Sequence, residues 1–119
     1  MLESADIIKQ DLLAMSVIGS VYILNGGVYR VCAGSSAAVR VATVKALNRM
    51  RIKVASIGKD LDQDVIFAMS GERKVEVRVE ALTAKSARMK ISAHQGEDTD
   101  VRTAAEVIAQ TERLLANPM

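Results

Sequence analysis

Three aspartates at alternate positions are the first residues in this sequence whose spacing suggests chemistry. Asp60, Asp62 and Asp64 have the spacing that opens a calcium-binding loop, in which carboxylate oxygens coordinate the ion. Such a loop also needs Gly at its sixth position and Glu at its twelfth, and those positions hold Val65 and Gly71. We therefore interpret the three aspartates as part of a solvated acidic loop and predict no metal site.

The single histidine, His94, is a candidate general base. It falls at the end of a predicted strand, on its polar face, and is followed closely by Glu97 and Asp98. A general base needs a nucleophile or a substrate within hydrogen-bond reach and a cleft around it. The sequence indicates neither, so we interpret His94 as an exposed residue without a catalytic role.

A group of basic residues near the end of the first predicted helix of the domain could bind phosphate or anionic lipid headgroups. Cations are also favoured near a helix C-terminus by the helix dipole alone, and we prefer this local interpretation. The group consists of Arg40, Lys45, Arg49, Arg51 and Lys53.

Two further motifs are excluded as reactive sites. Gly26 and Gly27 do not form a phosphate-binding loop, because the spacing is wrong and a strand follows them. Cys32 is the only cysteine, so it forms no intramolecular disulfide, and between Val31 and Ala33 it is typical of a small packed residue. We predict no catalytic residue and no cofactor, and hence a protein that is not an enzyme.

Composition indicates one soluble globular domain. The chain has 119 residues, of which 50% are hydrophobic and 25% charged. Its 16 basic and 14 acidic residues are interspersed, so no partner nucleic acid is expected. With one Phe, two Tyr and no Trp, the chain offers few aromatic surfaces for stacking.

The apolar run Leu12–Leu24 is about 13 residues long, whereas a membrane-spanning helix needs about 20. The residues before it are net acidic, which is not typical of a secretory signal. We therefore predict no transmembrane segment and, for the sequence as given, a cytoplasmic location. A signal missing from this sequence would instead make the protein periplasmic or envelope-associated.

The N-terminal residues 1–16 are predicted to form an amphipathic helix or a partner-contacting segment, because Ile8, Leu12 and Met15 recur at helical spacing. Residues 17–119 then form a single α+β domain. Its first element, Val17–Val31, has two interpretations: a hairpin that turns at Asn25-Gly26, or one long strand with a glycine bulge.

Two helices are predicted in the domain. The first begins at a cap formed by Ser35 or Ser36, and the last runs from about Val101 to about Ala116 behind an acidic lead-in. The apolar stripe of the first helix consists of Val39, Ala42, Thr43, Ala46, Leu47 and Met50.

Four strands are predicted between the helices. The first is the short strand Ile52–Val54, and a polar loop from Gly58 to Gln63 separates it from the second. The second strand is expected to point Val65, Phe67 and Met69 inward.

The third and fourth strands form a hairpin within Glu72–His94, whose period-two pattern is the clearest in the chain. The sets expected on its buried face are Val75, Val77 and Val79, then Met89, Ile91 and Ala93. On its polar face, Arg78, Arg88 and Lys90 are set against Glu76 and Glu80, so we interpret these charges as mutually balanced rather than as a working surface.

The expected fold is therefore α+β: a strand, a helix, a meander of four strands and a final helix, with one antiparallel sheet that carries its helices on a single face.

The sequence resembles a family of short, functionally uncharacterised bacterial proteins, many of them predicted lipoproteins. The resemblance covers roughly residues 20–115 and rests on a Tyr-x-x-x-Gly element at Tyr22–Gly26, an Ala-Thr-x-x-Ala-Leu helix core at Ala42–Leu47 and a Gly-Asp-like step at Gly96–Asp98. It implies a helix-grip-like fold, in which the sheet curls around a helix, and it favours one long strand over the N-terminal hairpin. It also implies envelope association, although the residues before Cys32 do not form a lipidation signal.

Two functional hypotheses follow. The first is a non-enzymatic structural or protein-interaction module that forms a homo-oligomer or binds a protein partner, using a sheet face, a sheet edge or the N-terminal helix. The alternative is a small-molecule or lipid binder that uses a cleft between helix and sheet, lined by the adaptable side chains of Met50, Met69 and Met89.

Overall fold

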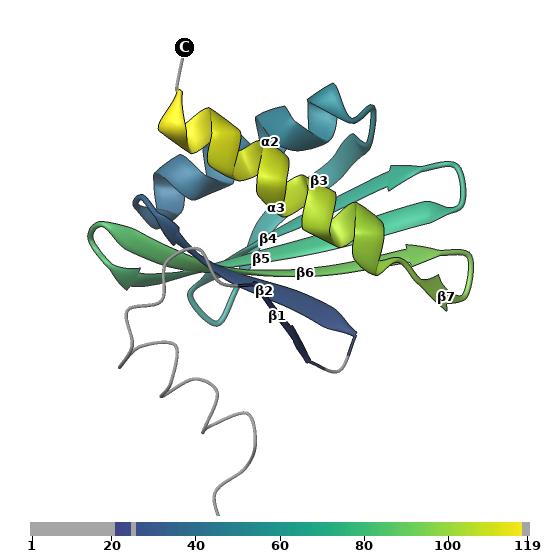
Figure 1. The fold of residues 1–119 in the computed structure, drawn as a ribbon, viewed down its shortest axis with the longest axis horizontal. Helices are drawn as coiled ribbons and strands as arrows, with labels where there is room; N and C mark the ends of the chain where they lie inside the picture. The colour runs from purple at the N-terminus through teal and green to yellow at the C-terminus, as the bar shows by residue number, and fades with distance from the viewer. Residues whose placement is uncertain (1–20, 25, 118–119) are drawn as a thin grey trace, which may run out of the picture.

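A computed structural model describes residues 21–24 and 26–117, and in this part of the chain one antiparallel sheet carries two helices (Figure 1). The predicted α+β class is thereby confirmed. The helices are α2 (Ser36–Arg49) and α3 (Val101–Ala116). The strands are β1 (Val21–Leu24), β2 (Gly27–Ala33), β3 (Lys53–Asp60), β4 (Gln63–Ser70), β5 (Arg73–Thr83), β6 (Ser86–Gln95) and β7 (Asp98–Thr99). The N-terminal helix predicted within residues 1–16 lies outside the described residues.

The sheet has the order β1-β2-β6-β5-β4-β3, and the short β7 also pairs with β6. Strands β3 to β6 follow one another as the predicted meander. Strand β2 lies on the other side of β6, so α2 carries the chain across the sheet from β2 to the far edge at β3 (Figure 1). This crossing brings β2 beside strands that come much later in the sequence.

The expectation of one long N-terminal strand is wrong. Strands β1 and β2 form an antiparallel hairpin in which Leu24 pairs with Gly27. Gly26 has a φ of 79°, a left-handed conformation that glycine adopts without steric cost. The local Asn-Gly signal was the better guide to this segment.

The polar loop predicted from Gly58 to Gln63 is also wrong, because β3 continues to Asp60 and β4 begins at Gln63. Leu61 and Asp62 form the turn between them with φ values of 50° and 67°. Strand β3 is an edge strand with mostly exposed side chains, so hydrogen bonds to β4 rather than an apolar pattern hold it extended.

Strand β4 faces the opposite way from the prediction, although Val65, which pairs with Arg78, is buried at 5% exposure. Ile66 and Ala68 point into the core, with exposures of 0% and 3%, whereas Phe67 and Met69 point outward and are each 46% exposed. The register with β5 explains this, because Ile66 pairs with the buried Val77 and residues paired in register share one side of a sheet.

The hairpin of β5 and β6 is as predicted. The three valines of β5 and the set Met89, Ile91 and Ala93 of β6 are all buried. Arg78 and Lys90, on the other side, pair with each other in register. The polar face of the hairpin therefore looks away from the core.

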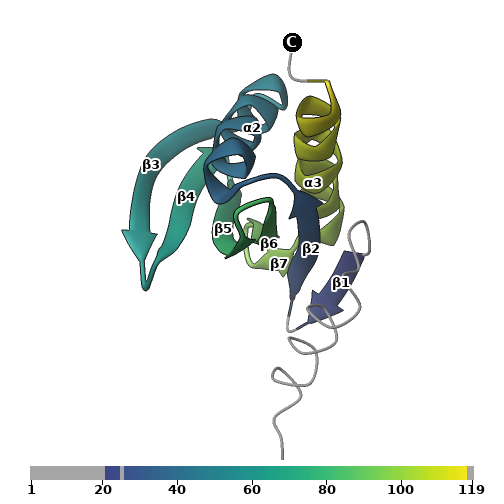
Figure 2. The ribbon, with the colours of Figure 1, turned by 90° about the vertical axis from the view of Figure 1, so that its left-hand side faces the viewer.

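Both helices cover one face of the sheet, as expected (Figure 2). The Ser35 hydroxyl caps α2 by accepting a hydrogen bond from the Ala38 amide, and Asp100 caps α3. Tightly buried side chains fill the space between helices and sheet. They include Val39, Leu47, Ile52, Ile66, Met89, Ile91, Val107 and Ile108.

Candidate functional site

The three aspartates with calcium-loop spacing do not converge, and the predicted solvated acidic loop is wrong for Asp64, which is buried on β4. Asp60 pairs with Arg78 at 2.9 Å on one side of the sheet. Asp64 points to the other side, where Arg40 and Lys59 approach its carboxylate at 3.9 and 3.7 Å. Within residues 21–24 and 26–117, no group of three or more His, Cys, Asp or Glu side chains is placed to hold a metal ion.

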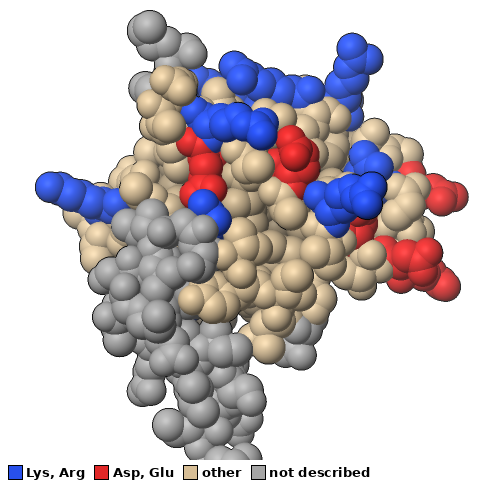
Figure 3. Space-filling model, viewed as in Figure 1, with Lys and Arg blue, Asp and Glu red and all other residues tan. Residues whose placement is uncertain are grey.

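The basic residues around the end of α2 are mostly exposed, and Arg40 alone among them ion-pairs with a described carboxylate, that of Asp64. Figure 3 shows Lys and Arg side chains gathered along the border of the molecule where α2 lies. The local interpretation, cations near a helix C-terminus, accounts for Arg49, the basic residue in the last turn of α2.

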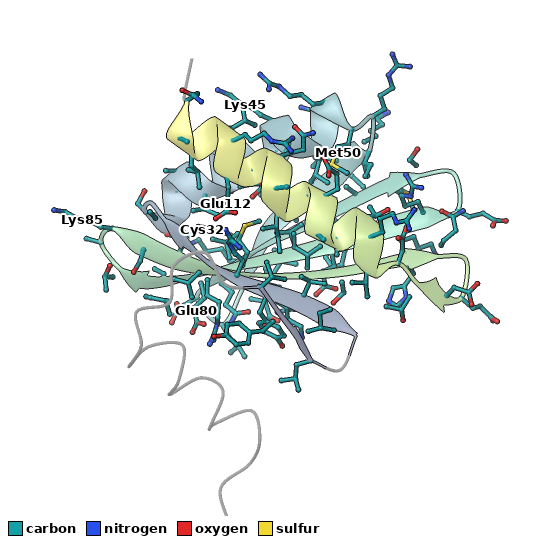
Figure 4. The ribbon with its side chains drawn as sticks, viewed as in Figure 1. Cys32, Lys45, Met50, Glu80, Lys85 and Glu112 are labelled. Atoms are coloured by element: carbon teal, nitrogen blue, oxygen red, sulfur yellow. The ribbon has the colours of Figure 1, made fainter. Side chains whose placement is uncertain are left out.

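Cys32 is a packed core residue, as predicted. It is fully buried on β2 and lies near Glu112 of α3 (Figure 4). Burial, reinforced by the negative charge of Glu112, raises the pKa of the Cys32 thiol from 9.0 to about 12. The thiol therefore stays protonated at neutral pH and is a poor nucleophile.

The face of the sheet opposite the helices holds the candidate site; we call it the outer face. In Figure 2 the sheet is bent, and its edges extend farther from the helices than its middle strands do. The register places Tyr29 of β2 next to Lys90 of β6, and Lys90 next to Arg78 of β5. These side chains thus form one row across the outer face.

Around this row lies a hollow of about 390 Å³, which we call the charged hollow. Its lining residues are Tyr29, Gln63, Glu76, Arg78, Glu80, Arg88 and Lys90. Figure 4 shows Glu80 on the side of the sheet away from the helices. The volume falls within the range of about 300 to 1,000 Å³ that is usual for small-molecule sites.

Ion pairs hold both arginines of the hollow in place. Arg78 donates hydrogen bonds to Glu76 at 2.7 Å and to Asp60 at 2.9 Å, and these contacts raise the pKa of Arg78 above its ordinary value. Arg88 donates to Glu80. These arginines are fixed cations, which suits binding rather than proton transfer, because a general acid or base needs a pKa near the working pH.

Lys90 differs from the two arginines. Its ammonium nitrogen lies 5.7 Å from the centre of the Tyr29 ring, a cation–π distance. Among the described residues, no carboxylate lies within ion-pair distance of Lys90. The charge of Lys90 is therefore the least compensated in the hollow.

Beside the charged hollow lies a second depression of about 260 Å³, which we call the apolar groove. Its lining residues are Ala55, Phe67, Ala68, Met69, Lys74, Val75, Glu76, Ser92 and His94. His94 is exposed on this face, as predicted, and contributes to the rim of the groove. The sequence interpretation missed the groove because it placed Phe67 and Met69 in the core.

No helix in the described part of the chain is long and apolar enough to cross a membrane. Comparison of the chain with protein families gives no match, and comparison with curated proteins gives none either.

Proposed function

We propose that this protein is a non-enzymatic interaction module that binds a second copy of itself through the outer face of its sheet. One observation carries the proposal: Phe67 and Met69, adjacent on the same side of β4, are each 46% exposed on the face that lies away from α2 and α3. Single exposed apolar side chains are ordinary, but a contiguous apolar patch is typical of an interaction surface.

The chemistry of this pair suits a protein contact. Phe67 offers a rigid ring, the type of side chain that is enriched in interfaces, and Met69 has a flexible thioether that adapts to an irregular partner surface. Ala55 and the aliphatic part of Lys74 extend the apolar area of the groove. Burying these groups against a partner would remove them from water, at about 25 cal/mol for each Å² of apolar surface.

The charges around the groove favour a second copy as the partner. Glu76 and Lys74 lie on the same side of β5 and line the same groove. A two-fold axis near the groove would bring the same two charges of opposite sign to both sides of the contact, and a two-fold contact is self-complementary by construction. A strongly acidic or strongly basic partner would match only one of the two signs.

The non-enzymatic character is supported by the state of the reactive groups. The Cys32 thiol is buried and protonated, and the arginines of the charged hollow are engaged by carboxylates. A ligand-binding cleft between helix and sheet, the alternative hypothesis, has less support. Met50 packs against the core and Met89 is fully buried, while Met69 is on the outer face.

Residues 1–16 are the second candidate contact with a partner. They lie outside the described residues, so the proposal for them rests on their amphipathic spacing alone. Deleting residues 1–16 therefore distinguishes a contact made by the N-terminal segment from one made by the sheet.

The experiment is mass measurement by multi-angle light scattering over a range of protein concentrations. We expect the full chain to form a dimer and Phe67→Ser to be monomeric, while Leu61→Ser remains a dimer. Leu61 is the matched control because it is 90% exposed in the β3–β4 turn and does not line the groove. A full chain that is monomeric at every concentration would overturn the proposal. A variant without residues 1–16 that remains dimeric assigns the contact to the sheet, and a monomeric one assigns it to the N-terminal segment.

A further inference from the structure

The pairing of Lys90 with Arg78 sets two positive charges opposite each other in the sheet. The two residues are direct partners in the register of β6 and β5 and point to the same side. Like charges at directly opposed positions destabilise a sheet. Arg78 is engaged by Glu76 and Asp60, so the question is what compensates Lys90.

The carboxylates of the hollow do not compensate Lys90. Glu76 accepts a hydrogen bond from Arg78 and Glu80 accepts one from Arg88, so each lining carboxylate is engaged by an arginine. Asp60, at the rim, is also engaged by Arg78. The lining of the hollow contains three cations and two carboxylates, and Asp60 at the rim brings the carboxylates to three. All three carboxylates are engaged by the two arginines, so Lys90 is the cation of the hollow that has no carboxylate partner among the described residues.

Hydrogen-bond donors remain for a ligand. A guanidinium has five N–H groups, and Arg88 uses one terminal nitrogen for Glu80. Arg78 uses its Nε for Glu76 and one terminal nitrogen for Asp60 and Gln63. The ammonium of Lys90 adds three donors, and the ring of Tyr29 limits its movement on one side.

From this geometry we propose that the charged hollow is an oxyanion-binding site, with Lys90 as its central cation and with Arg78 and Arg88 as flanking donors. The ligand group is a carboxylate or a phosphate, because both present several acceptor oxygens to converging N–H groups. The cations of this site are different residues from Phe67 and Met69, although Glu76 lines both depressions.

The bound oxyanion would offset the repulsion between Lys90 and Arg78. It would also replace water around Lys90 with charge-assisted hydrogen bonds, which are roughly twice as strong as neutral ones. Because the hollow is open and its charges are partly screened by Glu76 and Glu80, binding is weak and falls as ionic strength rises.

The experiment is a titration of the full chain, labelled with ¹⁵N, followed through its backbone amide signals at constant ionic strength. Sodium acetate and sodium phosphate are the two probes, so the separate titrations distinguish a carboxylate from a phosphate ligand. We expect saturable shifts at the amides of Tyr29, Arg78, Arg88 and Lys90 with at least one probe. Shifts that stay linear with both probes, or that spread evenly over the molecule, would overturn the proposal.

Two variants make the test specific. In Lys90→Met the saturable shifts should be lost, whereas in Lys85→Met they should persist, because Lys85 is an exposed lysine in the β5–β6 turn, outside the hollow. Persistence in Lys90→Met, or equal loss in both variants, would count against the site. If Lys90→Met does not fold, Lys90→Gln removes the charge but keeps a polar side chain, and it gives the same readout.

The same titration of Phe67→Ser separates the two proposals. A monomeric Phe67→Ser protein that still shows the saturable shifts supports both of them. Loss of the shifts in that monomer would show that the anion response belongs to the dimer, and the hollow of one chain would then not be a site by itself.

Discussion

Glu76 lies directly opposite Phe67 in the pairing of β5 with β4, on the outer face of the sheet. A carboxylate and an aromatic ring are thus neighbours at the point where the two depressions meet, because Glu76 lines both the charged hollow and the apolar groove. A partner that buries Phe67 must therefore also contact the charge of Glu76. This junction makes the outer face one continuous surface.

The first prediction concerns which side chains of β4 face the core. Ile66→Ala should lower the free energy of unfolding by about 2 to 5 kcal/mol, because Ile66 is fully buried. Phe67→Ala should lower it by about 1 kcal/mol or less in the monomer, because the ring is already half exposed. Urea denaturation at low protein concentration measures both values. Similar losses for the two variants would mean that Phe67 belongs to the core.

Asp100 should stabilise α3 in a pH-dependent way. The Thr103 hydroxyl and backbone amide donate hydrogen bonds to its carboxylate at 2.6 and 3.0 Å and lower the pKa of Asp100 below its ordinary value of 3.8. Asp100→Ala should therefore cost about 1 kcal/mol at neutral pH.

The sign of the pH effect follows from this lowered pKa. The stabilisation is present above the pKa of the unfolded state and disappears as the pH falls through the lower pKa of the folded state. Urea denaturation of wild type and Asp100→Ala should therefore converge at strongly acidic pH. Asp98→Ala, an exposed residue of β7, is the control and should change stability by less than about 0.5 kcal/mol. A gap between wild type and Asp100→Ala that is independent of pH would contradict this account of the cap.

Cys32 should be unreactive in the folded protein. A thiol reagent at neutral pH should label it only after unfolding in urea, because the thiol is fully buried and protonated. Between the unfolded pKa of 9.0 and the folded pKa of about 12, the unfolded chain releases the thiol proton and the folded chain keeps it. The free energy of unfolding should therefore decrease as the pH rises through this window, and Cys32→Ala should lack that part of the decrease. Equally fast labelling with and without urea would show that the Cys32 thiol is accessible to the reagent in the folded protein, and would contradict its burial.

The ion pair between Arg30 and Glu112 should contribute measurably to stability. It joins β2 to α3 through two parallel contacts, Nε to Oε2 at 2.8 Å and Nη2 to Oε1 at 2.6 Å, and the side chains are only 18% and 27% exposed. Glu112→Gln should lower the free energy of unfolding by about 1 to 2 kcal/mol.

The matched control for Glu112 is Glu106→Gln on the same helix. Glu106 is 47% exposed and meets Arg113 at 3.8 Å, so its loss should cost less than about 0.5 kcal/mol. If urea denaturation gives equal effects for the two variants, the ion pair between Arg30 and Glu112 contributes no more to the free energy of unfolding than an exposed ion pair does.

The sequence identified the buried side of a strand correctly where only one of its two faces is apolar, and failed where both faces are apolar. In β5 and β6 a single set of alternate residues is apolar, so the pattern identified the buried side correctly. In β4 both sets are apolar, with Ile66 and Ala68 on one side and Phe67 and Met69 on the other. Only the register with Val77 decides between them, and no local pattern contains that register.

Other features depended on pairing between distant segments. The individual charges of the hollow were identified, but Tyr29 meets Lys90 only because α2 carries the chain across the sheet and leaves β2 beside β6. The turn places Leu61 in a left-handed conformation, where glycine, asparagine or aspartate is usual, and β3 was therefore ended too early.

The central claim, that the outer face is a binding surface between two copies, is tested most directly by following the amide signals of the full chain from low to high protein concentration. We predict that the signals that change belong to β4 and β5 around Phe67, Met69, Lys74 and Glu76, and that Phe67→Ser abolishes the changes while Leu61→Ser does not. Changes confined to α2 and α3, or spectra that are identical at every concentration, would contradict the claim.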